Sequence, residues 1–187
     1  MNVFSGGCAL ALMALLVVPQ AGSETLDVIA KAAPKGAATG AITVPMIVQI
    51  DRYTPEHART TMTDGLKFGG YPGFLKALRD APPAGTIEVA GEKFVIRWAR
   101  EVPTATGRTV SLITETPVFF VGIGRRGAPP TAGYEVAVVQ LTFDKSGKGT
   151  GTMAAAARVK PGGDTGVRLD TYADAPLTLT ATVRTAR

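Results

Sequence analysis

The sequence predicts a mainly β protein, an antiparallel sandwich or flattened barrel of about nine strands with one inserted short helical hairpin. Short apolar segments with two-residue periodicity recur along the C-terminal two-thirds of the chain. The 22 glycines and 13 prolines punctuate these segments with turns and disfavour long helices. The clearest unit is a hairpin in which the segments YEVAVVQLTF, DKSGKG and TGTMAAAARV form a strand, a turn and a strand.

This hairpin, residues 134–159, is expected to form the centre of the sheet. Its turn is built from Asp144, Ser146, Gly147 and Gly149, because glycine reaches positive φ without steric cost and Asp or Ser can bond nearby amides. Each strand has one expected apolar face, with Val139, Leu141 and Phe143 on the first strand and Met153, Ala155, Ala157 and Val159 on the second.

The first 23 residues have the pattern of a secretory signal. The apolar run 8–18 is shorter than the roughly 20 residues that span a bilayer. Ala21 and Ser23 place small side chains where cleavage after Ser23 requires them. We therefore expect a secreted or periplasmic protein that begins near Glu24 and lacks cysteine, with an uncleaved anchor as the alternative.

Residues 24–40 are rich in Ala and Gly and are expected to be a flexible leader, in which 26–33 could form a weak helix before Pro34. A single β-rich domain is expected over residues 41–187. Its first strand, 42–50, contains Pro45, which predicts a sheet edge or a bulge because proline cannot donate to a strand ladder.

Two short helices follow. Thr54 and Pro55 suit the N-cap and first helical position, Gly70 suits the end of the first helix, and the second runs from Pro72 to Pro82. Helical spacing predicts buried side chains at Ala58, Met62 and Leu66 on the first helix and at Phe74, Leu75 and Leu78 on the second.

The remaining segments are expected to be strands. Phe94, Ile96 and Trp98 are predicted to share one face of their strand. The last strand alternates most clearly and indicates one buried and one solvated face. Its predicted buried set is Leu177, Leu179, Ala181 and Val183, and its solvated set is Thr178, Thr180, Thr182 and Arg184. The other expected strands are 86–89, 108–116, 117–123 and 167–172.

The net charge of +5 is spread along the chain, which favours a solvated basic surface over a nucleic-acid site. Arg125 and Arg126 form the only adjacent basic pair and are the candidate anion-binding site, since guanidinium groups suit carboxylate or phosphate. They lie in GIGRRG, which spells GxGxxG, but Pro129 and Pro130 follow where a dinucleotide site needs a helix.

His57 is the only histidine and the candidate acid or base, with an acidic partner such as Glu56; the alternative is an exposed helical residue. Beyond residue 23 the only serines are Ser111 and Ser146, and neither lies in GxSxG. A zinc site would need more His or Cys ligands. The sequence therefore predicts no catalytic set, cofactor or metal.

The chain contains six short segments in this order: DGLKFGG, GFLKAL, IRWAR, LITETP, LTFDKSGKG and ADAPL. Through these segments, residues 53–183 resemble a family of secreted bacterial proteins of unknown function, in which the same segments occur in the same order. The resemblance implies a shared fold and an envelope or extracellular location, and it assigns no catalytic residue. One departure is Glu115-Thr116, where Asp-Arg is usual before the proline, and the other is the loop with Arg125 and Arg126.

The leading functional hypothesis is a secreted, non-catalytic β-domain with a binding or envelope-associated structural role. Its partner is unknown, with an envelope component or the membrane surface as candidates and nucleic acid excluded. One alternative is a barrel that carries a small apolar ligand, suggested by Trp98, Phe119 and Phe120. The other is a hydrolase that uses His57 with an acidic partner.

Overall fold

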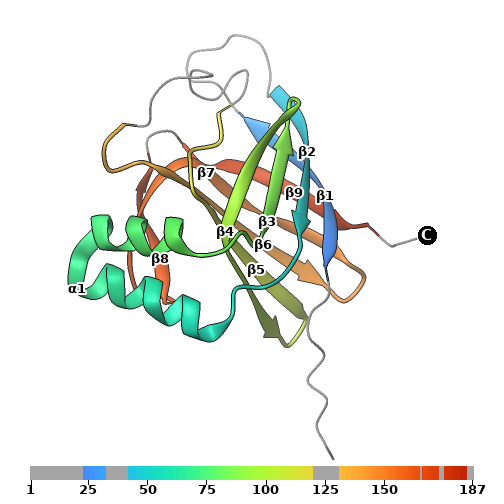
Figure 1. Ribbon diagram of the computed structural model, residues 1–187. Coiled ribbons are helices and arrows are strands. Elements are labelled where there is room, and N and C mark those ends of the chain that lie inside the picture. Colours follow the sequence, from blue (N-terminus) through green and yellow to red (C-terminus); the bar gives the residue numbers. More distant parts are fainter. Residues whose placement is uncertain (1–22, 33–41, 120–130, 165, 173–174, 185–187) are drawn as a thin grey trace, which may run out of the picture.

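The computed structural model describes residues 23–32, 42–119, 131–164, 166–172 and 175–184. These residues form nine strands and one kinked helix (Figure 1). In chain order the elements are β1 (Glu24–Ala32), β2 (Ile42–Ile50), α1 (Glu56–Asp80), β3 (Gly85–Val89), β4 (Glu92–Thr104), β5 (Gly107–Thr114), β6 (Val136–Asp144), β7 (Lys148–Pro161), β8 (Val167–Tyr172) and β9 (Leu177–Val183).

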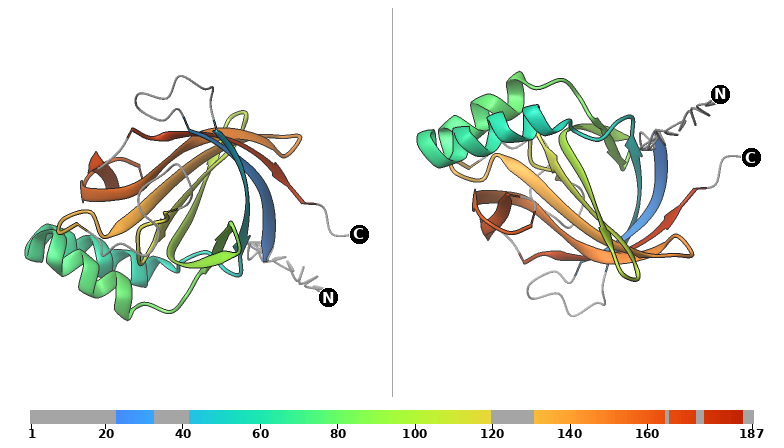
Figure 2. Two further views of the ribbon diagram at one scale, coloured as in Figure 1. Left: turned by 90° about the horizontal axis from the view of Figure 1, so that it is seen from above. Right: turned by 90° about the horizontal axis from the view of Figure 1, so that it is seen from below.

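The strands close into an antiparallel barrel and do not form a sandwich. Their order is β6-β5-β4-β3-β2-β1-β9-β7-β8, and an additional β6–β7 pairing joins the ends of an eight-stranded ring. Closure leaves no open edge within that ring. Strand β8 stands outside it and pairs with the C-terminal part of β7, while α1 lies beside the barrel (Figures 1 and 2).

Residues 24–32 are part of the barrel, which corrects the expectation of a flexible leader or a weak helix. They form β1, which pairs with β2 on one side and with β9 on the other. Leu26, Val28 and Ala30 are buried and belong to the core. Local sequence signals disguise this strand, because Ala30 and Ala32 are weak strand formers and Pro34 follows closely.

The expected number of strands is confirmed, although one member differs. Strand β1 takes the place of the expected strand at 117–123. Residues 117–119 lie outside any strand, and the rest of that segment lies outside the described residues. Pro45 in β2 pairs with Ile29 of β1 but lies beyond the end of β3, so the missing amide hydrogen interrupts no ladder on that side.

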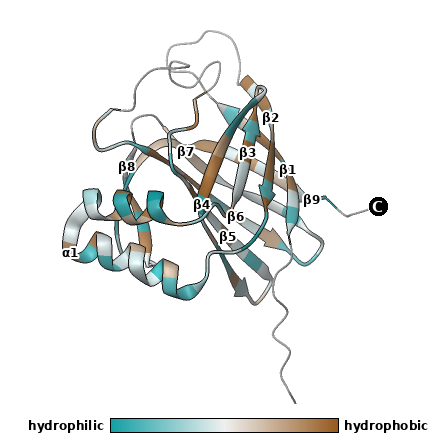
Figure 3. Cartoon of the chain, in the orientation of Figure 1, coloured by the Kyte–Doolittle hydropathy of each residue, from teal (hydrophilic) through white to brown (hydrophobic). Residues whose placement is uncertain are grey.

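Apolar side chains form a buried core inside the barrel, as the alternating strands predict. Figure 3 shows how hydrophobic and hydrophilic residues are distributed over the strands. Val139, Leu141 and Phe143 of the central hairpin point inward, and so do Leu177, Leu179 and Ala181 of the last strand. The predicted inward faces of both are therefore largely confirmed. Other large members of this core are Met46, Val48, Ile50, Ile87, Ile96, Leu112 and Met153.

Glycine allows neighbouring strands to approach closely at two positions in the barrel. A Cβ atom at Gly107 would lie 1.9 Å from the carbonyl oxygen of Phe143, and one at Gly151 would lie 1.9 Å from that of Gln140. Both distances are far below a van der Waals contact. The close approach of the strands therefore requires glycine at these positions.

The predicted helical hairpin is confirmed. Helix α1 is broken at Gly70, whose φ of 63° and ψ of −161° are not helical, so it forms two arms. The arms cross at Gly65 and Gly73, where a Cβ on either residue would meet the backbone of the other at 2.8 Å or less. Five of the six side chains predicted to be buried are buried, namely Met62, Leu66, Phe74, Leu75 and Leu78. Ala58 is only half-buried, and Tyr71 is buried in addition.

A second apolar core forms between α1 and the outer wall of the barrel. The helical side chains pack on outward-facing residues of five strand segments, namely Trp98, Ile113, Val136, Val159 and Val167. Two predictions are corrected here. Trp98 does not share a face with Ile96, and Val159 does not share a face with Met153. Register shifts in β4, β6 and β7 produce these changes of face.

Candidate functional site

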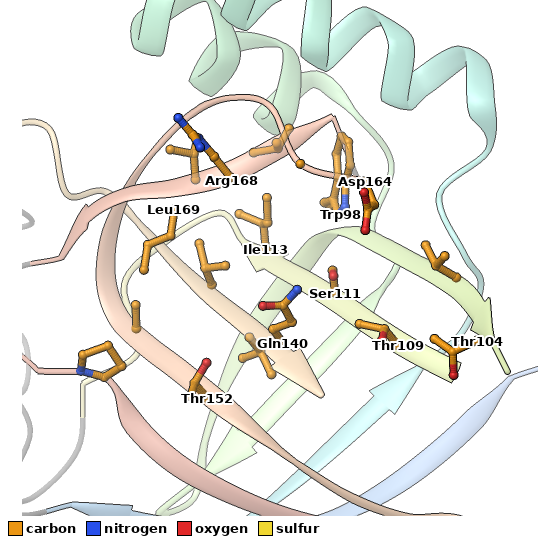
Figure 4. Close-up of a pocket in the computed structure, with 18 residues that line it drawn as sticks. Trp98, Thr104, Thr109, Ser111, Ile113, Gln140, Thr152, Asp164, Arg168 and Leu169 are labelled. Carbon is orange, nitrogen blue, oxygen red and sulfur yellow. The ribbon is translucent and has the colours of Figure 1, made fainter. Parts of the chain in front are cut away.

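One cavity in the described part of the chain is a groove of about 370 Å³ on the outer face of β4, β5, β6 and β7, overarched by the β7–β8 hairpin (Figure 4). We call it the outer groove. Its volume falls within the range of about 300–1,000 Å³ that small-molecule sites occupy. It lies on the outside of the sheet, whereas the main cluster of buried apolar side chains lies inside the barrel.

A bulge in β4 creates one wall of the groove. The β4–β5 register shifts between Ile96 and Trp98, which turns Trp98 outward into the groove wall, where it is 1% exposed. Thr54 satisfies the backbone groups at the bulge: its Oγ1 accepts from the Ala99 amide at 2.8 Å and donates to the Arg97 carbonyl at 3.4 Å.

Thr54 therefore fixes the bulge and does not cap the helix as predicted. The N-cap of α1 is Pro55, and no side chain bonds to the helix start. The Thr54 amide also donates to the Ala99 carbonyl at 2.8 Å. Since Ala99 is the residue after Trp98, this bond ties the start of the helical hairpin to the groove wall. No local sequence signal distinguishes such a threonine from a helix cap.

The β7–β8 hairpin forms the roof of the groove. Its turn contains Gly162, Gly163 and Gly166, all with positive φ, and Gly162 N–H donates to the Gly166 carbonyl at 3.2 Å. Lys160 pairs with Asp170 at 2.8 Å across the two strands. The hydrogen bond from Lys160 lowers the pKa of the Asp170 carboxyl below its usual range.

The groove has an apolar end and a polar end. The apolar end borders the second core and is lined by Trp98, Ile113, Val138, Val159, Val167 and Leu169. The polar end runs along the outer faces of β4 to β7 and is lined by Thr104, Thr109, Ser111, Gln140 and Thr152 (Figure 4). Asp164 and Arg168 from the roof are the charged lining residues. The arrangement suits a ligand with one apolar and one neutral polar part.

A polar cluster near one end of the barrel consists of Glu24, Tyr53, Glu101 and Arg108. Arg108 binds both carboxylate oxygens of Glu24, at 3.0 and 2.5 Å, and lies 3.3 Å from Glu101. Tyr53 donates its hydroxyl hydrogen to Glu24, and the Arg108 guanidinium stacks over the Phe143 ring at 5.2 Å. The cluster ties the first residue of β1 to β5.

The pKa values of both Tyr53 and Arg108 are raised within this cluster. Burial, and then the hydrogen bond to Glu24, raise the pKa of the Tyr53 hydroxyl well above its usual value. Burial by itself would lower the pKa of Arg108, but hydrogen bonding to Glu24 and the charge of that carboxylate raise it overall. The four groups thus form a network of hydrogen bonds and ion pairs with a structural role.

Of the three predicted site residues, the structure describes only His57. His57 lies exposed on the first arm of α1 and lines a shallow depression with Lys76 and Asp80. Among the described residues its imidazole makes no hydrogen bond or ion pair, and Asp80 is bound to Lys76 at 2.6 Å. Arg125 and Arg126 lie outside the described residues.

Ser146 and Glu115, which the sequence analysis also singled out, make contacts that stabilise the fold. Ser146 Oγ donates to the Asp144 carboxylate at 2.7 Å within the hairpin turn, as that turn predicts. Glu115 binds Arg97 at 2.6 Å, and Arg97 also donates to the carbonyl of Ala81 at the end of α1. Glu115 thus helps to dock the helical hairpin through Arg97. Ser111 lines the outer groove, a role its position in a strand did not reveal.

Within the described ranges, no group of three or more His, Cys, Asp or Glu side chains is arranged to hold a metal ion. No helix in the described part of the chain combines the length and the apolar character needed to cross a bilayer. Comparison with protein-family models, with curated proteins and with solved structures found no match to this chain.

Proposed function

We propose that this protein is a non-catalytic binding domain that holds a small, uncharged amphipathic ligand in the outer groove. The observation that carries the proposal is the contrast between a filled barrel interior and a groove of about 370 Å³ outside it. The apolar end of the groove favours a hydrocarbon part, and its hydroxyl and amide groups favour a neutral polar part.

Trp98 provides a direct test because it is the only tryptophan and lines the groove. Octyl glucoside, used below its micelle concentration, is a suitable neutral probe, with octanoate as the anionic comparison. We expect saturable change in Trp98 emission with octyl glucoside and a weaker response to octanoate.

A matched pair of variants separates binding in the groove from binding elsewhere. Gln140→Phe fills the groove from an exposed position on β6, whereas Gln49→Phe makes the same change on an exposed position of β2. Loss of the emission change in Gln140→Phe alone supports the proposal. An unaltered titration in Gln140→Phe, with the fold intact by circular dichroism, refutes it.

We also propose that the protein works outside the cytoplasm, in the envelope or the medium. Strand β1 begins at Glu24, so cleavage after Ser23 leaves the barrel complete. The remaining chain contains no cysteine and needs no particular redox environment. Fractionation of expressing cells, followed by intact-mass measurement, tests this: a cytoplasmic protein of full mass contradicts it.

A further inference from the structure

A regular set of uncharged side chains covers the outer surface of β5, β6, β7 and β9. We call it the hydroxyl face. Its members are Thr109, Ser111, Gln140, Thr142, Thr150, Thr152, Thr178, Thr180 and Thr182. All but Thr109 and Ser111 are exposed. The polar end of the outer groove is one edge of this surface, because Thr109, Ser111, Gln140 and Thr152 also line the groove (Figure 4).

Strand register aligns these side chains in two rows. One row passes from Thr109 to Thr142, Thr150 and Thr180, which are direct cross-strand partners in turn. The second row passes in the same way through Ser111, Gln140, Thr152 and Thr178. Neighbouring strands lie about 4.8 Å apart and same-face residues about 6.8 Å apart, so the rows form a grid.

The chemistry of this grid suits a partner rich in hydroxyl groups. Each threonine hydroxyl can donate one hydrogen bond and accept others, and each methyl group adds a small apolar contact. Ile29, the cross-strand partner of Thr180, is 43% exposed and extends the row with a larger apolar side chain. Sugar rings present the same mixture of hydroxyl groups and C–H faces.

Charge also discriminates between partners. Threonine is common on exposed strands, so residue type alone says little. However, the nine members of the face include no ionisable side chain, in a protein with a net charge of +5. Strands β3 and β4, by contrast, carry charged side chains on their exposed surface, where Lys93 lies 3.8 Å from Glu88. Charged side chains occur at the border of the face. Asp27 is paired with Arg184, and Lys148, the cross-strand partner of Thr182, lies close to Asp144. Lys31 is the cross-strand partner of Thr178 at the opposite corner.

We propose that the hydroxyl face binds a neutral polysaccharide, with the outer groove accommodating one end or a substituent of the chain. The two rows contain no ionisable side chain, which favours a neutral polymer, and continuity with the groove gives the surface a defined starting point. The inference partly rests on the proposed function, since the face and the groove share four residues. It extends that function from a small ligand to a polymer.

The test is co-sedimentation of the full chain with insoluble neutral polysaccharides, namely cellulose, chitin and starch, and affinity electrophoresis in soluble dextran and in acidic polygalacturonate. We expect binding to at least one neutral polymer that persists at high salt. Thr150→Val with Thr180→Val removes two central hydroxyl groups at nearly constant shape, and we expect binding to weaken by about tenfold or more. Thr86→Val, on β3 away from the face, is the matched control and should bind normally.

Each outcome is decisive for the face. Absence of binding to every neutral polymer, by protein shown to be folded, overturns the inference. Equal binding by the double variant and by Thr86→Val also overturns it, as does binding to polygalacturonate alone. The Trp98 titration with octyl glucoside is independent of these results in the double variant, because Thr150 and Thr180 do not line the groove. Failure of the face and failure of the groove can therefore be told apart.

Discussion

Replacing Arg108 with Met should destabilise the barrel because it leaves two carboxylates without their cation. Arg108 makes a two-pronged contact with Glu24 and lies 3.3 Å from Glu101. Removing one partner of a buried ion pair costs about 3–5 kcal/mol. The side chains of Arg108 and Glu101 are 22% and 28% exposed, so water recovers part of the loss. We therefore expect a decrease of about 3 kcal/mol in the free energy of unfolding.

Urea unfolding and thermal unfolding, both followed by circular dichroism at neutral pH, measure this loss. For a chain of this size, about 3 kcal/mol corresponds to a decrease of roughly 6–12 °C in Tm. Arg184→Met is the control, because its pair with Asp27 is half exposed and should change neither measurement.

The double variant with Glu24→Gln tests the mechanism behind this loss. Neutralising Glu24 removes one of the stranded carboxylates, so the double variant should lose less stability than the sum of the two single variants. A loss below about 1 kcal/mol in Arg108→Met, or strict additivity in the double variant, would refute the reasoning.

Three further predictions concern closure and pH. Gly151→Ala should lower the free energy of unfolding by about 1–3 kcal/mol in urea because the strands must separate, whereas Gly69→Ala, which meets nothing within 4 Å, should not. A chain that starts at Glu24 should unfold cooperatively, and a chain that starts at residue 33 should not, because it lacks β1. Burial raises the pKa of Tyr53 and Tyr71, so stability is full below the unfolded value of 10.0 and falls as pH rises above it. Urea midpoints between about pH 8 and 11 should show this fall, and the double change of both tyrosines to Phe should flatten it.

Local patterns were enough to predict most of the elements. The alternation in 177–183 requires a strand with one buried face, and its apolar side chains point inward. Gly70 and Pro72 interrupt helical periodicity, so the two arms of α1 follow from local chemistry. Strand β1 was missed because its stability comes from pairing with β2 and β9, which lie far from it in sequence or across a long connection.

The outer groove could not be predicted from the sequence. It depends on the bulge that turns Trp98 outward and on the β7–β8 hairpin that folds over three other strands. Neither feature has a local signature, since Trp98 alternates regularly with its neighbours in the sequence. The sequence suggests only a nucleophile search for Ser111. Its place in the groove depends on the pairing of β5 with β6, where Ser111 lies opposite Gln140.

Eight of the nine strands, the helical hairpin and the buried face of the last strand follow from the sequence, because these properties depend on side chains two to four residues apart. Closure of the sheet into a barrel, the part of residues 24–32 in it, and the faces occupied by Trp98 and Val159 follow only from tertiary structure. Closure, bulges and a shared hydroxyl surface arise from hydrogen bonds between strands distant in the chain, and local periodicity does not identify such partners.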